Sequence, residues 1–333
     1  MATLKVMTWN VENLFRPAPA APQAERQRFQ RKIDLLATVI SQIDPHVVAL
    51  QEVGGEGPLH DLQEALAGAY QHHAISPFPD RRGIRVAFLT KHAVIEQADI
   101  VDFPPGPALD IHGLTSTGDS TPITRMGRGA LRIRVTTGGL TVDLITAHVK
   151  SKLLTFPRPG GSSFTPRDEN ERAQVGGIAL MQRTAEVVTL RIHANALLEG
   201  NPMTPLLLMG DFNDVPEAQT SLILNGPTGS EIGTDGFDRP DQGDDARLFN
   251  LAPAIPPERR FSRIHRGRRE LLDQIFASEE LLPFDPPGDH RRLPAVDSHI
   301  DFANQLPSIG DNPGERATEV APDHAPVTAQ FDV

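Results

Sequence analysis

The sequence contains no cysteine among its 333 residues, and it has a single tryptophan and a single tyrosine. Without cysteine the chain forms no disulfide, no zinc–thiolate site and no thiol nucleophile. It also lacks an apolar stretch long enough to span a bilayer, and no apolar segment of the signal-peptide type follows Met1. We therefore expect a cytoplasmic protein that is not inserted in a membrane.

Positive charge is also scarce, because 32 Lys and Arg face 43 Asp and Glu and give a formal net charge of −11. This balance argues against a uniformly basic surface for nucleic acid, but it leaves room for a local basic patch. The carboxylates fit divalent cation binding, although surface solubility is the commoner reason for such an excess. The apolar fraction of 39% is ordinary for a globular protein, and we expect one domain over residues 1–333.

Hydrophobic periodicity predicts strands and helices along most of the chain. The predicted helices cover residues 25–43, 59–66 and 169–198, and the predicted strands cover residues 4–9, 46–51, 85–90, 130–135, 140–147, 206–209, 271–276 and 327–331. The first strand, helix and strand predict a parallel pair with a crossover. Residues 130–147 predict an antiparallel hairpin around Gly138-Gly139, whereas residues 103–127 and 156–167 predict loops.

Polar side chains stand at the ends of these strands or, in one case, inside an apolar run: Asn10, Glu52, His148, Asp211 with Asn213, Asp273, and Asp323 with His324. Each has an ordinary interpretation as a turn former or a hydrogen-bonded structural residue. Together they suit metal-assisted phosphoester chemistry. Carboxylates such as Glu52 and Asp323 suit Mg²⁺ or Mn²⁺, histidines stabilise or protonate phosphate oxygens, and Asp211 could orient an attacking water.

Six short segments carry a resemblance to a known family: Thr8-Trp9-Asn10-Val11, Gln51-Glu52-Val53, Ala147-His148, Gly210-Asp211-Phe212-Asn213, Leu272-Asp273-Gln274-Ile275-Phe276 and Asp323-His324-Ala325-Pro326-Val327. In this order they resemble the endonuclease/exonuclease/phosphatase superfamily, which includes DNase I-like nucleases, exonuclease III-like repair enzymes, inositol polyphosphate phosphatases and sphingomyelinases. The resemblance spans nearly the whole chain. It implies a four-layer α/β sandwich, with two packed, mostly antiparallel sheets and helices outside.

The resemblance also implies a role for each polar residue. Glu52 would be the principal metal ligand, completed by Asn10 and Asp323 directly or through water. Asp211 would position the nucleophilic water with the help of Asn213. His324, oriented by Asp273, and His148 would contact the scissile phosphate. DNase I-like relatives orient the first histidine with a carboxylate before a mid-chain strand, and Gly83-Ile84-Arg85-Val86 offers none, so the partner of His148 stays open.

Basic residues suggest where the substrate phosphates lie. Arg128 resembles the phosphate-binding arginine of the family, although it could be a surface residue in a glycine turn. His148-Val149-Lys150-Ser151-Lys152 resembles a bacterial branch with many nucleases, which would make Lys150 and Lys152 phosphate contacts. Residues 258–269 contain six arginines, which could contact a phosphate backbone or pair with the acidic residues 225–245.

The expected function is a Mg²⁺- or Mn²⁺-dependent phosphodiesterase that cleaves nucleic acid, DNA foremost, by in-line attack of water. One alternative is hydrolysis of a lipid, a phosphoinositide or a small phosphate ester, which the acidic net charge favours and the low aromatic content of 5% disfavours. Another is a non-catalytic binding protein on the same fold. The pattern does not distinguish DNA from RNA, or endonucleolytic from exonucleolytic cleavage.

Overall fold

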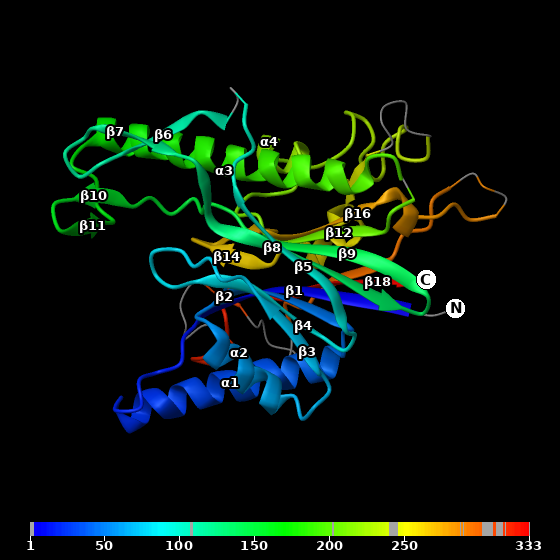
Figure 1. Cartoon of the computed structure of the whole chain (residues 1–333), viewed down its shortest axis with the longest axis horizontal. Coiled ribbons are helices and arrows are strands. Elements are labelled where there is room, and N and C mark those ends of the chain that lie inside the picture. The colour runs from blue at the N-terminus through cyan, green and yellow to red at the C-terminus, as the bar shows by residue number, and fades with distance from the viewer. Residues whose placement is uncertain are drawn as a thin grey trace.

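Two six-stranded sheets lie face to face at the centre of the protein (Figure 1). The computed structural model describes residues 3–106, 109–201, 203–239, 246–286, 288, 290–301, 309–310, 316 and 318–332. Sheet A has the order β17-β18-β1-β2-β4-β3 and sheet B the order β13-β16-β12-β9-β8-β5. Only the central pairs β1/β2 and β12/β9 are parallel, and the other neighbours are antiparallel.

The strands of sheet A are β1 (Thr3–Leu14), β2 (Val47–Val53), β3 (His72–Ile75), β4 (Arg85–Thr90), β17 (Ala295–Ser298) and β18 (Val327–Asp332). Those of sheet B are β5 (Val94–Asp102), β8 (Arg125–Thr137), β9 (Leu140–His148), β12 (Leu206–Asp211), β13 (Leu248–Asn250) and β16 (Asp273–Ser278). Each parallel pair needs a crossover helix, supplied by α1 (Gln23–Ile43) for β1/β2 and by α3 (Glu169–Leu198) for β9/β12.

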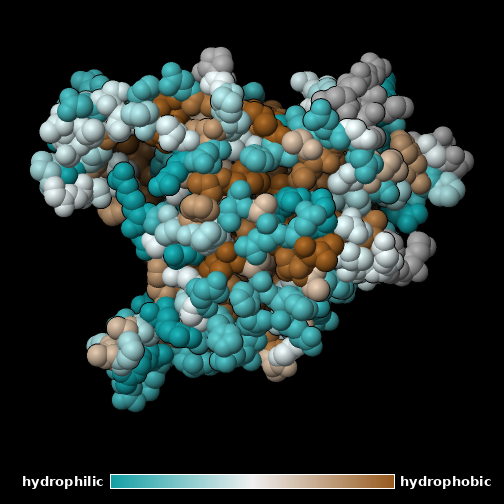
Figure 2. All heavy atoms as spheres, viewed as in Figure 1, coloured by the Kyte–Doolittle hydropathy of each residue, from teal (hydrophilic) through white to brown (hydrophobic). Residues whose placement is uncertain are grey.

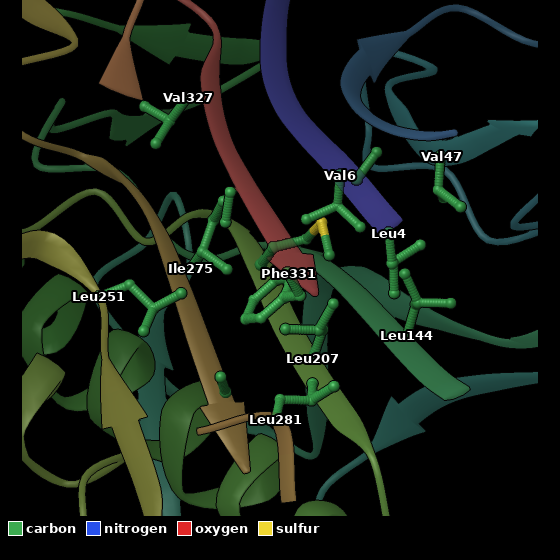
Figure 3. Close-up of a cluster of buried hydrophobic side chains, with 14 of the residues drawn as sticks. Leu4, Val6, Val47, Leu144, Leu207, Leu251, Ile275, Leu281, Val327 and Phe331 are labelled. Carbon is green, nitrogen blue, oxygen red and sulfur yellow. The ribbon is translucent and has the colours of Figure 1, made fainter. Parts of the chain in front are cut away.

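Three apolar layers hold this arrangement together. One lies between the sheets and joins residues such as Val6, Leu144 and Phe331 (Figure 3). A second packs sheet A against α1 and α2 (Glu56–Ala65), and a third packs sheet B against α3. The central strands are therefore buried on both faces, which explains why Leu206–Asp211 begins as a continuous apolar run rather than an alternating one. The fold is the predicted four-layer α/β sandwich.

Shorter elements extend from the sandwich. They are the hairpins β6 (Ile111–Leu114) with β7 (Ser120–Ile123), β10 (Phe156–Arg158) with β11 (Gly161–Ser163) and β14 (Arg263–His265) with β15 (Arg268–Glu270), the helix α4 (Gln219–Leu222), and the 3₁₀ turns Ala252–Ala254, Pro257–Arg259 and Glu279–Leu281. In Figure 1, β10 and β11 lie at the left edge, β14 lies further inward, left of the centre, and β1 runs toward that side from the N-terminus at the right. No helix within the described ranges is long and apolar enough to cross a membrane.

Most predicted elements are confirmed. The helix at 169–198 has the predicted bounds, β4 occupies 85–90, and the 130–147 hairpin forms β8 and β9. The loops predicted at 103–127 and 156–167 are wrong in part, because they contain β6–β7, the start of β8, and β10–β11. Strand β5 was not predicted. Only Ile100 of its nine residues is buried, so the sequence carries no alternating apolar pattern there.

Candidate active site

Three of the polar residues predicted from sequence are direct neighbours in sheet B. Asp211, the last residue of β12, pairs in register with His148 at the end of β9 and with Asp273 at the start of β16. Residues that pair in register project from the same face of a sheet. All three side chains are buried. The strand register therefore places two carboxylates and one imidazole side by side.

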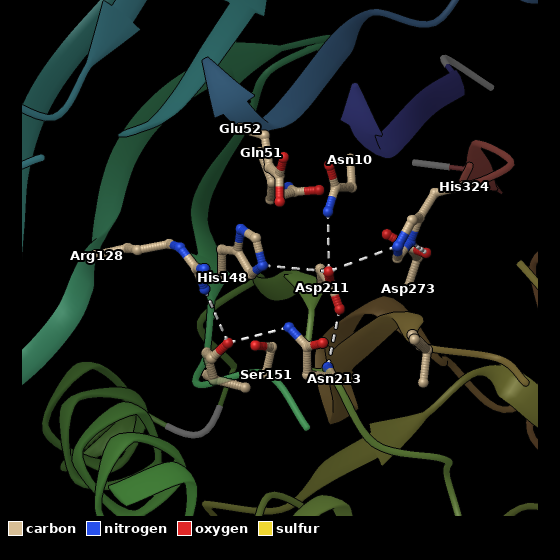
Figure 4. Close-up of polar contacts among 12 residues, drawn as sticks. Asn10, Gln51, Glu52, Arg128, His148, Ser151, Asp211, Asn213, Asp273 and His324 are labelled. Carbon is tan, nitrogen blue, oxygen red and sulfur yellow. Dashed lines mark hydrogen bonds and ion pairs between the residues drawn. The ribbon is translucent and has the colours of Figure 1, made fainter. Parts of the chain in front are cut away.

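Sheet A contributes the residues that face this row (Figure 4). Asn10 of β1 donates from Nδ2 to Asp211 Oδ2 over 3.0 Å. His148 Nε2 lies 3.3 Å from the same oxygen, and Nε2 of His324, just before β18, lies 3.9 Å from it. One carboxylate oxygen thus faces three nitrogen-bearing side chains from both sheets, at the strand ends where the sequence predicts the site.

The turn after β12 fixes the Asp211 carboxylate. Its other oxygen, Oδ1, accepts from the Asn213 backbone N over 2.8 Å, and Asn213 Nδ2 donates to Val149 O over 3.1 Å. Gly210 allows β12 to approach β9 closely. Its φ is +151°, and a Cβ there would lie 2.0 Å from Ala147 O, so any other residue would push the two strands apart.

His324 and Asp273 form a buried charged pair. His324 Nδ1 lies 2.6 Å from Asp273 Oδ2, and Trp9 Nε1 donates to His324 O over 2.9 Å. Burial opposes the charge on the ring, but the carboxylates of Asp273 and Asp211 outweigh it and raise the pKa of His324 to about 10. The imidazole is therefore cationic at neutral pH, with Nε2 directed toward Asp211.

Asp211 and His148 differ from His324 in their protonation. Burial raises the pKa of Asp211 to about 6, with Asp273 adding to the effect and His324 opposing it. Burial, followed by the charge of Arg128, holds the pKa of His148 well below its usual range. At neutral pH His148 is therefore neutral and His324 is cationic, whereas the pKa of Asp211 lies close to the pH itself.

No partner for His148 Nδ1 occurs within the described ranges, although this atom is buried. The carboxylate nearest in sequence to the start of β4 is Asp80, and it contacts Arg128 Nε over 3.3 Å instead. Arg128 also donates to Val149 O over 3.3 Å, and its side chain points toward His148 in Figure 4. Among the described residues, no carboxylate accepts a hydrogen bond from His148 Nδ1, as the sequence indicated.

The expected metal ligands lie in a corner beside this group. Glu52 lies with Asn10 and Gln51 on the side of Asp211 that faces sheet A (Figure 4). Its Oε2 accepts from Asn13 N over 2.9 Å. The carboxylates of Glu12, Asp323 and Glu52 all raise the pKa of Lys32, although burial lowers it more. These carboxylate oxygens are the hard donors that Mg²⁺ and Mn²⁺ prefer, so the residues present fit such an ion.

A second arrangement could also hold a metal ion. One ligand atom from each of Asp211, Asp273 and His324 lies within 4.8 Å of the others. Asp273 Oδ1 is buried and has no partner in the described part of the chain. A metal on His324 would have to displace the proton of an imidazole whose pKa is about 10.

The lysines predicted to contact phosphate are engaged elsewhere. Lys150 Nζ donates to Ser151 O and Leu153 O over 3.0 and 3.1 Å. Lys152 Nζ lies 3.1 Å from Asp214 and 3.3 Å from Glu270. Their assignment to substrate phosphate stays a prediction.

The arginine-rich segment divides between structural and exposed roles. Arg259 pairs with Asp297 at 2.7 Å, and Arg260 donates to the backbone carbonyls of Pro253 and Ile255. Arg268 is exposed on hairpin β14–β15, and the exposed Arg269 stacks on Phe261. Residues 240–245 of the acidic stretch lie outside the described residues.

Sequence reasoning missed two residues that join the site together. Gln51 Nε2 donates to Thr8 of sheet A and to Thr146 of sheet B over 3.1 and 3.0 Å, so it links the sheets beneath the site. Glu12 donates from N to Asn10 Oδ1 over 3.0 Å and accepts from Asp323 N over 3.1 Å at Oε2. Gln51 directly precedes Glu52 and Glu12 follows Asn10 by two positions, which was the available signal.

The surface is hollowed at the edge where these strand ends meet. Figure 2 shows a notch at the left, between the region of β10 and β11 above and the start of α1 below, with mostly hydrophilic walls. A cavity of about 230 Å³ adjoins the site, since its lining includes Glu12, Asn13 and Lys32. The cavity therefore lies on the Glu12 side of the site, whereas Asp211, His148 and His324 are themselves buried.

Solved structures share this fold at low sequence identity. A truncated TDP2 from Caenorhabditis elegans matches with a TM-score of 0.55 and 15% identity, covering 99% of this chain and 98% of that one. The human Nocturnin catalytic domain gives 0.53 and 16%, covering 99% and 94%. A mannosyl-6-phosphatase from Bacteroides thetaiotaomicron gives 0.54 and 13%, covering 99% and 100%.

No curated protein sequence matches the chain. The model of the endonuclease/exonuclease/phosphatase family matches residues 7–294, which include most of both sheets and the polar strand ends from Asn10 to Asp273. Family and fold together indicate a phosphoester hydrolase. The chain belongs to the endonuclease/exonuclease/phosphatase family.

Proposed function

We propose that the protein is a phosphodiesterase that hydrolyses nucleic acid, DNA foremost, with Mg²⁺ or Mn²⁺ as its cofactor. One observation carries this proposal: the Asp211 carboxylate faces Asn10, His148 and His324 at the open ends of both sheets. A buried carboxylate with a pKa of about 6 is suited to orient a water molecule and to accept its proton. No serine or cysteine nucleophile is needed.

The residues of the chain divide the reaction between them. Asp211, held by the Asn213 backbone, directs a water to the phosphorus atom and takes up its proton as the oxygen–phosphorus bond forms and the bond to the leaving oxygen breaks. His324 remains charged through Asp273 and stabilises the negative phosphate oxygens. His148 contacts the phosphate from the other side, near Arg128.

A metal ion completes the proposed site. Glu52, Asn10 and Asp323 would hold it, and the ion would neutralise charge on the phosphate as a Lewis acid. We favour this corner over the group of Asp211, Asp273 and His324 because a metal on His324 would have to displace a proton from an imidazole whose pKa is about 10.

Exposed arginines support nucleic acid as the substrate. Hairpin β14–β15 forms a backbone bridge with His324 through Arg263 and carries Arg268 and Arg269 on its exposed strand. Arginines in this position match a phosphate backbone that continues beyond the scissile bond. The local positive charge offsets the acidic balance of the whole chain.

The test is a substrate panel of plasmid, DNA and RNA oligonucleotides with Mg²⁺, Mn²⁺, Ca²⁺ or EDTA. We expect metal-dependent cleavage that the Asp211→Asn substitution lowers by roughly 10²-fold or more, because the variant cannot accept the proton of the water. Asp119→Asn, an exposed carboxylate in the β6–β7 turn, is the matched control. Absence of metal-dependent cleavage of all these nucleic acids would refute the proposed substrate.

A second candidate keeps the chemistry and changes the substrate to a lipid headgroup or a small phosphate ester. Two exposed apolar side chains favour it: Leu153 and Phe164, with 60% and 71% of their area exposed, follow the site residue His148 along the chain. Such side chains could contact an apolar carrier. Hydrolysis of phospholipid or sugar phosphate at rates far above DNA cleavage would establish this alternative.

A further inference from the structure

Arg263 lies beside the site residues Asp323 and His324, and none of the predicted catalytic or metal-binding roles belongs to it. It is the first residue of β14, and its backbone forms an isolated antiparallel bridge with His324. Its guanidinium lies 3.0 Å from Asp323 Oδ2. Residues directly opposite in such a bridge project to the same side. Arg263 therefore lies beside the histidine whose Nε2 faces Asp211.

The Arg263 guanidinium is only partly satisfied. Its Nε is buried and has no hydrogen-bond partner in the described part of the chain, whereas 30% of the side chain is exposed. A buried donor without an acceptor is unfavourable, and it indicates that the acceptor comes from outside the described residues, as a bound anion would. The guanidinium edge that carries Nε can donate two parallel hydrogen bonds to one oxyanion. An Nε without a partner therefore suits the binding of such an anion.

The other arginine of this corner, Arg316, is held more firmly. Arg316 contacts the Glu12 carboxylate and also donates to Ala321 O and Gly310 O over 2.9 and 3.2 Å. Lys32 Nζ donates to Glu12 O. Only 6% of the Arg316 side chain is exposed. Of the two arginines, Arg263 is the one whose release from its carboxylate disturbs fewer contacts.

We propose that Arg263 is a further phosphate-binding residue, and that its guanidinium and a divalent ion are alternative partners of the Asp323 carboxylate. The inference rests on the proposed function, which makes Asp323 a metal ligand. Without metal, Arg263 neutralises Asp323. When a divalent ion binds Asp323, the guanidinium is available to a phosphate oxygen beside His324. Metal binding thereby prepares an anion site that the metal-free protein lacks.

An ordinary structural salt bridge predicts the opposite behaviour. If Arg263 serves only to hold Asp323 in position, its removal should weaken metal binding, because a ligand loses its orientation. If the two cations compete, its removal should strengthen metal binding and weaken phosphate binding at the same time. The two readouts therefore move in opposite directions only under the proposal.

The experiment measures Mn²⁺ binding to the full chain by isothermal titration calorimetry, followed by binding of inorganic phosphate at saturating Mn²⁺. For Arg263→Gln we expect Mn²⁺ binding tighter by roughly two- to fivefold, the effect of removing one partly exposed ion pair. We expect phosphate binding weaker by about tenfold, as for loss of a charge-assisted hydrogen-bonded contact. Arg292→Gln, which removes the same charge from a partly exposed ion pair with Asp285, should change neither by much.

A second variant separates charge from shape. Arg263→Lys keeps a cation for Asp323 but lacks the planar fork, so Mn²⁺ affinity should stay close to that of the unmodified protein while phosphate binding falls. Weaker Mn²⁺ binding in Arg263→Gln, or equal effects in Arg292→Gln, would overturn the inference and leave the proposed function standing. If the unmodified protein binds no Mn²⁺, the proposed metal dependence fails, and the inference fails with it.

Discussion

The buried pair of His324 and Asp273 gives the most quantitative prediction. Replacing Asp273 by Asn keeps the size of the side chain and an acceptor for His324 Nδ1, but it removes the charge that stabilises the imidazolium. The folded-state pKa of His324, about 10, lies above the ordinary value of 6.5. A raised pKa contributes stability that is fully present below the unfolded value and is lost as pH rises through the folded value.

The expected size follows from these two pKa values. At pH 7 the protonated ring contributes about 4 kcal/mol, since each pH unit below the folded pKa is worth about 1.4 kcal/mol. Near pH 9 the same contribution falls to about 1.5 kcal/mol. Asp211 remains at 3.9 Å in the variant and retains part of the effect. We therefore expect Asp273→Asn to cost about 2–4 kcal/mol at pH 7 and about 1 kcal/mol at pH 9.5.

Urea unfolding in EDTA at several pH values between 7 and 9.5 measures this difference. Subtracting the variant from the unmodified protein cancels groups that titrate equally in both, such as Lys150, whose pKa burial lowers to about 8. The same substitution in a His324→Gln background should have a cost that does not vary with pH. A cost that stays constant over this range in the His324 protein would refute the charged pair.

Two further substitutions test how the sheets position the site, each by urea unfolding. Gly210→Ala should destabilise the protein by roughly 3 kcal/mol or more, because the new Cβ would meet Ala147 O at 2.0 Å. The control is Gly177→Ala, which should be neutral or stabilising because Gly177 is exposed in α3 and a Cβ there would have no atom within 4 Å. Equal effects of the two substitutions would contradict the close approach of β12 to β9. Gln51→Leu should lower the free energy of unfolding by about 1–3 kcal/mol, because it leaves the buried hydroxyls of Thr8 and Thr146 without the amide that joins them. An unchanged urea midpoint would show that the link between the sheets is dispensable.

Most of the buried strands could be located in the sequence because they are apolar runs with polar ends, whereas the four-layer arrangement was implied by the family resemblance. Leu206–Asp211 illustrates this, since four apolar residues precede Gly210 and Asp211 and no other element type fits so short a run. The same property located Asn10, His148 and Asp211. Their meeting at one carboxylate oxygen was not visible in the sequence, because it depends on the registers of β9, β12 and β16 and on how the two sheets face one another.

Contacts between distant charged residues were also beyond sequence reasoning. The arginine-rich segment left two interpretations open, and the structure divides the residues individually: Arg259 pairs with Asp297, and Arg263 with Asp323. Neither partner lies in the acidic stretch 225–245 that composition suggested. A surface loop has no periodicity that ties a charge to a partner far along the chain, so composition could predict that the arginines matter but could not assign them.

Backbone conformation adds a constraint that links the metal corner to the water-positioning turn. Among the described residues, seven other than glycine have positive φ, and four of them are Glu12, Asn13, Glu52 and Asn213. Such conformations cost energy and persist where the surrounding structure imposes them. In β1 and β2 they coincide with register shifts after Asn10 and after Leu50, and these shifts let Asn13 N reach Glu52 Oε2.

The strands thus give up regular pairing at the positions where Asn10 and Glu52 are directed toward Asp211. Regular strands would alternate their side chains between the two faces, so the irregular backbone, rather than the residue types alone, allows both sheets to contribute to one site.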